Sequence, residues 1–273
     1  MTVDVSVLCL VKGRHKALEN LLSGLSASTK LPDEFILVLM NEEARELPKT
    51  PFPVEQVILN HRMPLPLAAA RNLASKHARG RLLIFLDVDC IPAPDLIERY
   101  RAADSDGHLL NGEVRYLSEG VTDRKGFLSD LDALSKADPI RAGLESLPYE
   151  LFWSLNFACT AKDYRKIGGF DASFTGYGAE DTDFAFMARR AGIRMKKVSA
   201  LAYHQYHIDY APPVNHLADI VANARIFYSK WGKWPMEGWL KEFKKLGLIY
   251  WDDQSLKMLR MPDEEELLQS RKS

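Results

Sequence analysis

The feature that most constrains the fold is a regular alternation of strand-like and helix-like segments over the first hundred residues. Apolar, β-branched runs at 3–11, 34–40, 54–60 and 81–89 fit buried strands, and leucine or alanine spacing at 15–28 and 66–78 fits helices. Such alternation predicts an α/β fold with a mainly parallel, three-layer sheet. Ligands of these sheets bind at the carboxyl ends of the strands, which here means Lys12–Arg14, Met40–Glu42 and Asp87–Asp89.

The remainder of the chain changes character twice. Residues 104 to 150 are polar and irregular, and they predict one further strand at 109–117 and a loop over 130–150 that closes on a bound ligand. From Ala211 onward the sequence reads as helical and aromatic. We therefore expect one domain over 1–210, with halves 1–103 and 104–210, and a helical extension over 211–273.

Composition excludes several classes of protein. The chain has 36 basic and 37 acidic residues and a net charge of −1, so its bulk electrostatics do not favour nucleic acid. Its three cysteines are far apart, which argues against a zinc cluster or disulfide framework and suits a reducing cytoplasm. No apolar run approaches the ~20 residues of a membrane span. We expect a soluble cytoplasmic protein, and peripheral contact with a membrane is left open.

Two aspartates follow the most apolar strand. In "LLIFLDVDCIP", Asp87 and Asp89 would share one face if the segment is extended. Two carboxylates at the carboxyl edge of a sheet suit Mg²⁺ or Mn²⁺ that bridges phosphate oxygens. The alternative is a turn with solvated aspartates. "YHQYH" adds His204 and His207, of which one would suffice as an imidazole ligand, although both could equally be structural.

Basic residues stand beside these segments. Arg71, in "AAARNLASKHARG", would contact a phosphate or a sugar hydroxyl, or else pair with a nearby carboxylate. Lys12 and Arg14 lie at the end of the first strand, where a base or pyrophosphate would bind.

A third acidic segment is "GYGAEDTDFAFMARRAG", residues 176–192. Glu180, Asp181 and Asp183 crowd the start of a predicted helix whose apolar face includes Phe184 and Met187. Acids at a helix N-terminus can simply cap it. Three of them behind a glycine turn exceed that need, and so they are candidates to deprotonate a hydroxyl nucleophile or to bind substrate hydroxyls.

These segments together resemble the GT-A fold glycosyltransferases of family 2, most closely the subgroup with a galactosyltransferase-like second half. The resemblance rests on "VSVLCLVKGR", "AAARNLASKHARGRLLIFLDVDCIP", "GGFDASFTGYGAEDTDFAFMARRAG" and "YHQYH", in that order over residues 3 to 207. It implies transfer of a sugar from a nucleotide diphosphate, usually a UDP-sugar, to the hydroxyl of a carbohydrate or glycoconjugate acceptor. Residues 1–103 would then bind the donor, and residues 104–210 would contain the acceptor and catalytic half.

The family's roles transfer to particular positions. Asp87, Asp89 and His204 would hold Mn²⁺ or Mg²⁺ on the donor diphosphate, with His207 a weaker candidate. Arg71 would lie near the donor sugar or phosphates, beside Lys12 and Arg14.

Among the catalytic residues, Asp181 would be the general base and Glu180 would bind acceptor or donor hydroxyls. Tyr177 and Gly178 would also bind the acceptor. Asp183 would support the helix start. Direct in-line attack would invert the anomeric centre and needs no covalent sugar intermediate.

One position departs from the family. Many relatives end the second strand with an aspartate-rich turn that binds the base or ribose, whereas this chain has "VLMNEEARE" with Asn41 and Glu42. Asn41 would then contact the base.

Three alternatives remain at this stage. One is a retaining GalNAc-transferase-like enzyme, although that class usually has D-x-H. The second is a nucleotidyltransferase, whose glycine-rich loop is missing after the first strand. The third is a non-catalytic carbohydrate- or nucleotide-binding scaffold. Trp231, Trp234 and Trp239 either stack on a sugar or form a hydrophobic lid or dimer contact, and we favour the second interpretation.

Overall fold

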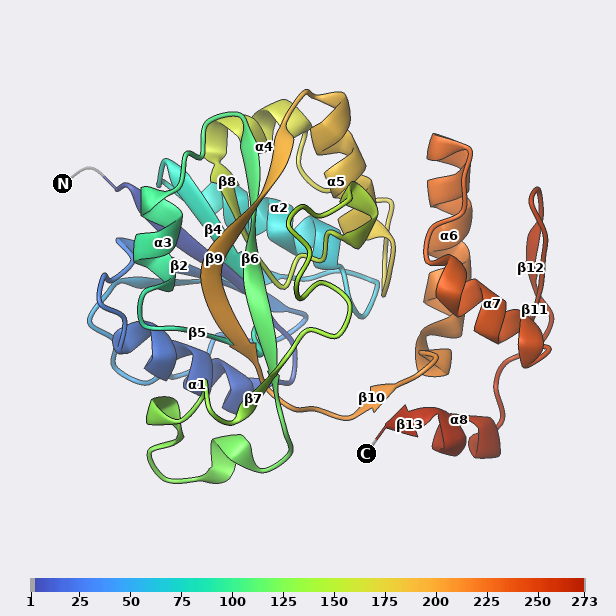
Figure 1. Cartoon of the computed structure of the whole chain (residues 1–273), viewed down its shortest axis with the longest axis horizontal. Coiled ribbons are helices and arrows are strands. Elements are labelled where there is room, and N and C mark those ends of the chain that lie inside the picture. Colours follow the sequence, from blue (N-terminus) through green and yellow to red (C-terminus); the bar gives the residue numbers. More distant parts are fainter. Residues whose placement is uncertain (1–2, 273) are drawn as a thin grey trace.

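One curled sheet organises the first three-quarters of the computed structural model, which describes residues 3–272 (Figure 1). Its strand order is β3-β2-β1-β4-β8-β6-β9-β5, with β7 paired to β6. The strands are β1 (Val5–Val11), β2 (Glu34–Met40), β3 (Val54–Leu59), β4 (Leu82–Leu86), β5 (Cys90–Pro92), β6 (His108–Leu117), β7 (Ser135–Ala137), β8 (Asn156–Thr160) and β9 (Arg194–His204).

Helices cover both faces of the sheet and produce three layers. One apolar cluster packs α1 and α3 against one face, and a second packs α2, α4 and α5 against the other. Both clusters draw on β1, β2 and β4, whose residues are buried throughout because helices lie on either side of them. These helices are α1 (His15–Ser26), α2 (Leu67–His77), α3 (Leu96–Ala102), α4 (Ala161–Ile167) and α5 (Glu180–Arg190).

The two halves of the sheet differ in direction. Strands β3, β2, β1 and β4 run parallel, whereas β8 is antiparallel to both β4 and β6. The pairing of Leu86 with Asn156 brings the segment before β8 beside the end of β4, and the amide of Asp87 donates to Leu155 O at 2.9 Å. The short strand β5 pairs antiparallel with β9, so that Cys90 faces His204. These two pairings set the positions of the candidate site residues.

The C-terminal extension forms a separate lobe, seen at the right of Figure 1. It has an apolar cluster of its own, which includes Ile220, Leu240 and Phe243. Its elements are α6 (Leu217–Trp231), α7 (Glu237–Lys245), a hairpin of β11 (Ile249–Trp251) and β12 (Leu256–Met258), α8 (Glu264–Ser270), and a short ladder of β10 (Asp209–Tyr210) with β13 (Arg271–Lys272).

The predicted fold class is confirmed, with the qualification that the second half of the sheet is mixed. The predicted strands and helices of the first hundred residues all occur, each ending within about three residues of its expected limit. The segment 130–150 contains β7 and a 3-10 turn, Tyr149–Leu151. Its closure over a ligand and the boundary at residue 210 stay predictions. Among residues 3–272, no helix is long and apolar enough to cross a membrane.

Candidate active site

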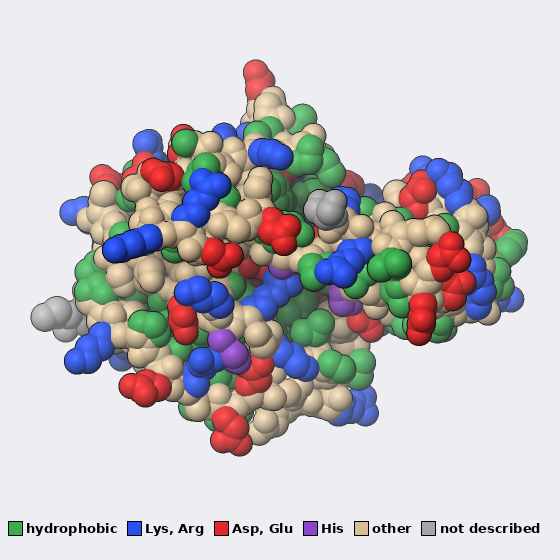
Figure 2. Space-filling view, turned by 90° about the horizontal axis from the view of Figure 1, so that it is seen from below, with side chains coloured by type: hydrophobic (Ala, Val, Ile, Leu, Met, Phe, Trp, Pro, Cys, Tyr) green, Lys and Arg blue, Asp and Glu red, His purple; other side chains and the backbone are tan. Residues whose placement is uncertain are grey.

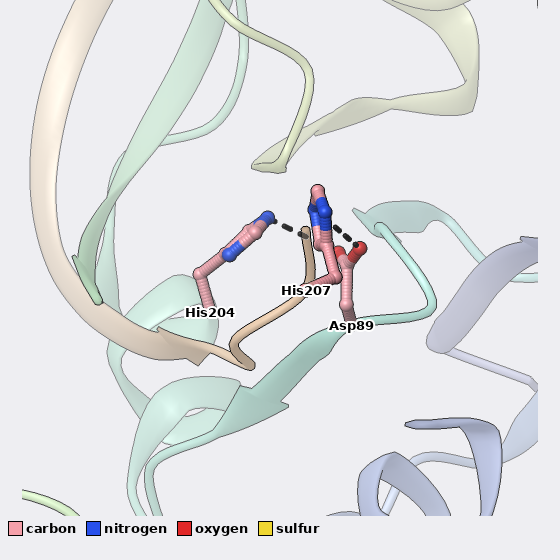
Figure 3. Close-up of side chains that lie close together, drawn as sticks. All are labelled: Asp89, His204 and His207. Carbon is pink, nitrogen blue, oxygen red and sulfur yellow. Dashed lines mark ion pairs between the residues drawn. The ribbon is translucent and has the colours of Figure 1, made fainter. Parts of the chain in front are cut away.

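A cluster of one carboxylate and two imidazoles lies at the junction of β5 and β9 (Figure 3). Asp89 immediately precedes β5, His204 ends β9, and His207 follows on the next loop. The Nε2 atoms of His204 and His207 lie 3.5 Å and 3.7 Å from the carboxylate oxygens of Asp89. One ligand atom from each of the three residues lies within 4.8 Å of the others, a spacing that fits one divalent cation.

The state of Asp89 supports this interpretation. Its carboxylate is 5% exposed, and its Oδ1 atom has no hydrogen-bond partner among residues 3–272, which is costly for a buried charge. Burial alone would raise the pKa of Asp89, but His204, Arg14 and His207 lower it. Burial lowers the pKa of His204, which favours the neutral imidazole that binds metals. The donor set therefore fits a bound cation.

A second part of the candidate site consists of Arg71 and three carboxylates that surround its guanidinium. Arg71 projects from α2, is 4% exposed, and lies 3.3 Å from Glu180 Oε1. Its guanidinium also lies 3.5 Å from Asp87 Oδ1 and 3.8 Å from Asp181 Oδ1. The central carbon of the guanidinium also lies over the ring of Phe170, 5.0 Å from its centroid. The Arg71 guanidinium thus contacts acidic groups both at the end of β4 and at the start of α5.

This arrangement alters the acidity of the three groups. Burial, together with the charge of Asp181, raises the pKa of Glu180 to about 8 despite the nearby arginine. Burial also raises the pKa of Asp87, against the opposing effect of Arg71. Burial alone would lower the pKa of Arg71, but the carboxylates raise it above its ordinary value, and the arginine stays charged.

Asp181 is held from a different direction. The hydroxyl of Ser154 donates to Asp181 Oδ1 at 2.7 Å, and the Ser154 amide donates to Oδ2 at 3.1 Å. The carboxylate retains 25% exposure, so it is reachable from solvent while its orientation is set. A carboxylate oriented in this way can accept a proton from a bound hydroxyl.

The acids do not cap α5 with their side chains. Ala179 occupies the N-cap position with φ of 71°, and Asp181 instead accepts from Ser154. Asp183 was expected to support the helix start, but its carboxylate accepts from Lys230 Nζ at 2.9 Å and from Trp231 Nε1 at 2.7 Å. It therefore joins α5 to α6, and Trp231 packs edge-on against Phe186. Trp231 therefore contacts α5 within the chain, and the lid or dimer contact favoured from the sequence stays a prediction.

The two aspartates of D-x-D do not share a face. The amide of Cys90 donates to Asp87 O at 2.8 Å, which turns the segment instead of extending it. The expectation of an extended segment was therefore wrong. Asp87 faces Arg71, whereas Asp89 faces the two histidines and the Arg14 guanidinium.

The predicted donor side lies at the ends of β1 and β2. Arg14 reaches Asp89, as noted, and keeps 43% of its side chain exposed. Lys12 Nζ donates to Pro64 O at 2.7 Å. The Asn41 side chain is used internally, since Nδ2 donates to Met63 O and Oδ1 accepts from the His61 amide. Asn41 therefore shapes the loop after β3, and its contact with a base stays a prediction.

A cavity of about 250 Å³ borders this cluster, between the start of α1 and the segment after β9. Asp89, His207 and Arg14 line it, together with Gln205 and Asn20, whose buried side chains are hydrogen-bonded at 2.7 Å. Figure 2 shows histidine and basic side chains in the hollow between the sheet and the C-terminal lobe.

The glycine turn before α5 lies against the C-terminal lobe. Tyr177 is 36% exposed and stacks on His216 and Trp239, with ring centroids 4.5 Å and 5.9 Å away. Gly178 has φ of 97°, a conformation that favours glycine. Burial, followed by the charges of Asp209 and Glu180, raises the pKa of Tyr177. The two residues predicted to bind the acceptor therefore adjoin the acidic cluster.

The sequence did not single out two residues that complete the site. Ser154 orients Asp181, and Asn223 of α6 hydrogen-bonds the glycine turn. Ser154 stood unremarked in "WSLNF", and Asn223 lies in the weakly matching C-terminal region.

In a comparison with protein families, residues 143–210 match a model described as the N-terminal domain of galactosyltransferase. A curated relative, validoxylamine A glucosyltransferase of Streptomyces hygroscopicus subsp. limoneus, is 23% identical over 221 residues. That alignment covers 70% of this chain and 49% of the relative, so the chain spans about half the relative's length.

Two solved structures share the fold. S. aureus TarS 1-349 matches with a TM-score of 0.55 and 15% identity, over 82% of this chain and 65% of that one. GalNAc-T7 with UDP, GalNAc and Mn²⁺ matches with a TM-score of 0.55 and 15% identity, over 76% and 44%. The resemblance inferred from the sequence is confirmed: the chain has the GT-A fold and a galactosyltransferase-like segment.

Proposed function

We propose that this chain is a metal-dependent glycosyltransferase that moves a sugar from a UDP-sugar to an acceptor hydroxyl with inversion. The main supporting observation is that a candidate cation cluster (Asp89, His204 and His207) and an oriented, solvent-reachable carboxylate, Asp181, both lie close enough to Asp87 for the charges of Asp89 and Asp181 to act on it. Relatives named as glycosyltransferases, and the UDP and Mn²⁺ in the GalNAc-T7 structure, support the choice of donor and metal.

The cation would be held by Asp89 and His204, with His207 as a further ligand and Asp87 nearby. A divalent ion there would stabilise the negative charge of the departing diphosphate. Arg14, which bonds Asp89 from a partly exposed position, would turn its guanidinium to a phosphate oxygen, a geometry that suits arginine. Lys12, at the same edge of the sheet, would add a second positive charge.

Asp181 would act as the general base. Ser154 holds both of its carboxylate oxygens, so the carboxylate is oriented before the acceptor binds. It would take the proton of the acceptor hydroxyl as the oxygen attacks the anomeric carbon and the bond to the diphosphate breaks. Glu180, whose raised pKa favours the protonated form, can donate a hydrogen bond to a sugar oxygen.

The test begins with donor binding. We expect UDP with Mn²⁺ to raise the melting temperature more than GDP, CDP or dTDP with Mn²⁺, because a ligand that binds only the native state stabilises it. His204→Ala should abolish this shift, and His77→Ala, at the end of α2, where the imidazole pairs with Glu55, should keep it. Absence of any nucleotide effect in the unaltered protein would contradict the proposal.

Catalysis is tested separately. The unaltered protein is incubated with UDP-glucose, UDP-galactose and their N-acetylated analogues and a set of glycoside acceptors, and UDP release and product are measured. Asp181→Asn should reduce transfer by at least about 100-fold, within the range typical of general-base loss, while UDP binding persists. Product with the anomeric configuration of the donor, seen by NMR, would refute inversion.

A further inference from the structure

A buried side chain of the C-terminal lobe, that of Asn223, bonds the backbone of the turn that leads into Asp181. Asn223, on α6, is 1% exposed. Its Nδ2 donates to Thr175 O and Gly178 O at 2.9 Å each and lies 3.3 Å from Tyr177 O, and its Oδ1 accepts from the Thr175 amide at 3.3 Å. The Asn223 side chain thus both donates hydrogen bonds to the backbone of residues 175–178 and accepts one from it.

A second set of hydrogen bonds to α6 involves Asp183, two residues after Asp181 in the chain. The carboxylate of Asp183 accepts from Lys230 and Trp231, at the C-terminal end of α6. Asp183 is 1% exposed, so these two bonds satisfy a buried charge. Asp181 therefore lies between two points at which α6 holds the chain, one before it and one after it.

The packing leaves little freedom at the turn. A Cβ atom on Gly176 would lie 2.3 Å from the Asp219 carboxylate of α6, so backbone and helix are in direct contact there. The Gly176 amide donates to Leu65 O at 3.0 Å, which also connects the turn to the segment before α2 and hence to Arg71. The turn therefore contacts α6 on one side and, on the other, the segment that leads into α2, the helix that carries Arg71.

We propose that Asn223 and Trp231 are positioning residues, through which the C-terminal lobe holds Asp181 in its reactive orientation. The inference rests on the proposed function, since it assigns the lobe a part in transfer that donor binding does not need. The candidate metal ligands lie at or next to the ends of β5 and β9, and neither Asn223 nor Trp231 bonds any of them. Loss of either set of hydrogen bonds should therefore lower the rate of transfer and leave UDP binding intact.

The test uses two substitutions with matched controls. Asn223→Leu keeps the approximate side-chain volume and removes every hydrogen bond to the turn. Its control is Asn215→Leu, the same change at an exposed position of the lobe. Trp231→Phe removes the indole N–H and keeps an aromatic ring against Phe186. Its control is Trp251→Phe, because the Trp251 Nε1 atom is buried without a hydrogen-bond partner among residues 3–272.

We expect Asn223→Leu to lower kcat by about 10- to 100-fold, since small misplacement of a catalytic group has effects of this size, with the KM for the UDP-sugar within about 2-fold. Trp231→Phe should lower kcat less, and both controls should match the unaltered protein. The UDP-induced, Mn²⁺-dependent rise in melting temperature should persist in all four variants, which shows that the donor site is folded.

A second measurement needs no substrate. Hydrogen exchange of peptides within 171–187 should accelerate in Asn223→Leu and remain unchanged in Asn215→Leu. Unchanged exchange, or unchanged kcat in Asn223→Leu, would overturn the inference and leave the proposed function standing. Failure of the unaltered protein to bind UDP would overturn the proposed function instead, and hydrogen exchange would still decide whether Asn223 holds the turn.

Discussion

Replacement of Arg71 by methionine tests the electrostatics of the site most directly. The substitution keeps a long, helix-compatible side chain and removes the cation that faces Glu180, Asp87 and Asp181. Below pH 6 Glu180 is protonated, because its pKa is about 8. The cost there is loss of a charge-assisted hydrogen bond, about 2 kcal/mol of unfolding free energy.

The cost should grow as the pH rises. In the unaltered protein the raised pKa of Glu180 means that stability declines from about pH 4.5 and levels off above about pH 8. Without Arg71 the pKa of Glu180 rises further. The unfolding free energy of Arg71→Met therefore continues to fall above about pH 8, where that of the unaltered protein no longer changes. One proton corresponds to about 1.4 kcal/mol per pH unit, which gives a total of about 3 to 4 kcal/mol at pH 9.

Thermal unfolding followed by circular dichroism between pH 6 and pH 9 measures this difference. At about 2 to 4 °C per kcal/mol for a chain approaching this size, the melting temperature should fall by about 4 to 8 °C at pH 6 and by more at pH 9. Arg190→Met, at an exposed position of α5, serves as the control and should show little change at either pH. A deficit for Arg71→Met that is the same at every pH would refute the reasoning.

Three further outcomes follow from the contacts described. Ser154→Ala should lower kcat by about 10-fold with unchanged UDP binding, since one hydrogen bond to Asp181 is worth about 1.4 kcal/mol; equal rates in a steady-state assay would contradict this. Asn72→Ala should lower the unfolding free energy by about 2 to 3 kcal/mol, because Asn72 bonds both the amide and the carbonyl of Phe170 as well as the Tyr164 hydroxyl; a melting temperature within 2 °C of the unaltered value would count against it. Glu34→Gln should lower the unfolding free energy by about 2 kcal/mol at pH 7. Burial opposes the ionisation of Glu34, but hydrogen bonds from Ser6 and Arg79 favour it and lower its pKa. That stability is fully present above the ordinary pKa of 4.5 and is lost as the pH falls through the lowered pKa of folded Glu34, so the two melting temperatures should converge as the pH falls; a constant gap would contradict the pairing.

Much of the first half of the fold was predictable because its signals are local. The buried strands at 34–40 and 82–86 are continuous apolar runs, and Gly80 marks the end of the preceding helix segment in the sequence. The mixed direction of the second half was not predictable in this way. Whether β8 runs parallel or antiparallel to β4 depends on which strands become neighbours, and no residue pattern within "NFACT" records that choice.

The candidate site likewise contains residues that the sequence could single out and residues that it could not. Residue types and order in the sequence singled out Asp89, His204 and Asp181 as candidates, because metal binding and proton transfer need particular side chains. Their partners were not identified, since hydrogen bonds from Ser154 and Asn223 join segments that are 27 residues and about 45 residues apart in the chain. The paths of Asp87 and Asp89 also diverge through a backbone turn, which a two-residue spacing does not reveal.

The pairing of Cys90 with His204 limits where this chain can vary in length. One residue inserted between Asp89 and β5 would shift Asp89 by about 3.3 Å and reverse the face to which it points. The same insertion in the exposed turn between β11 and β12 would leave that ladder unchanged. An engineer who wishes to enlarge or graft loops onto this scaffold therefore has room in the exposed connections and none between Asp89 and β5.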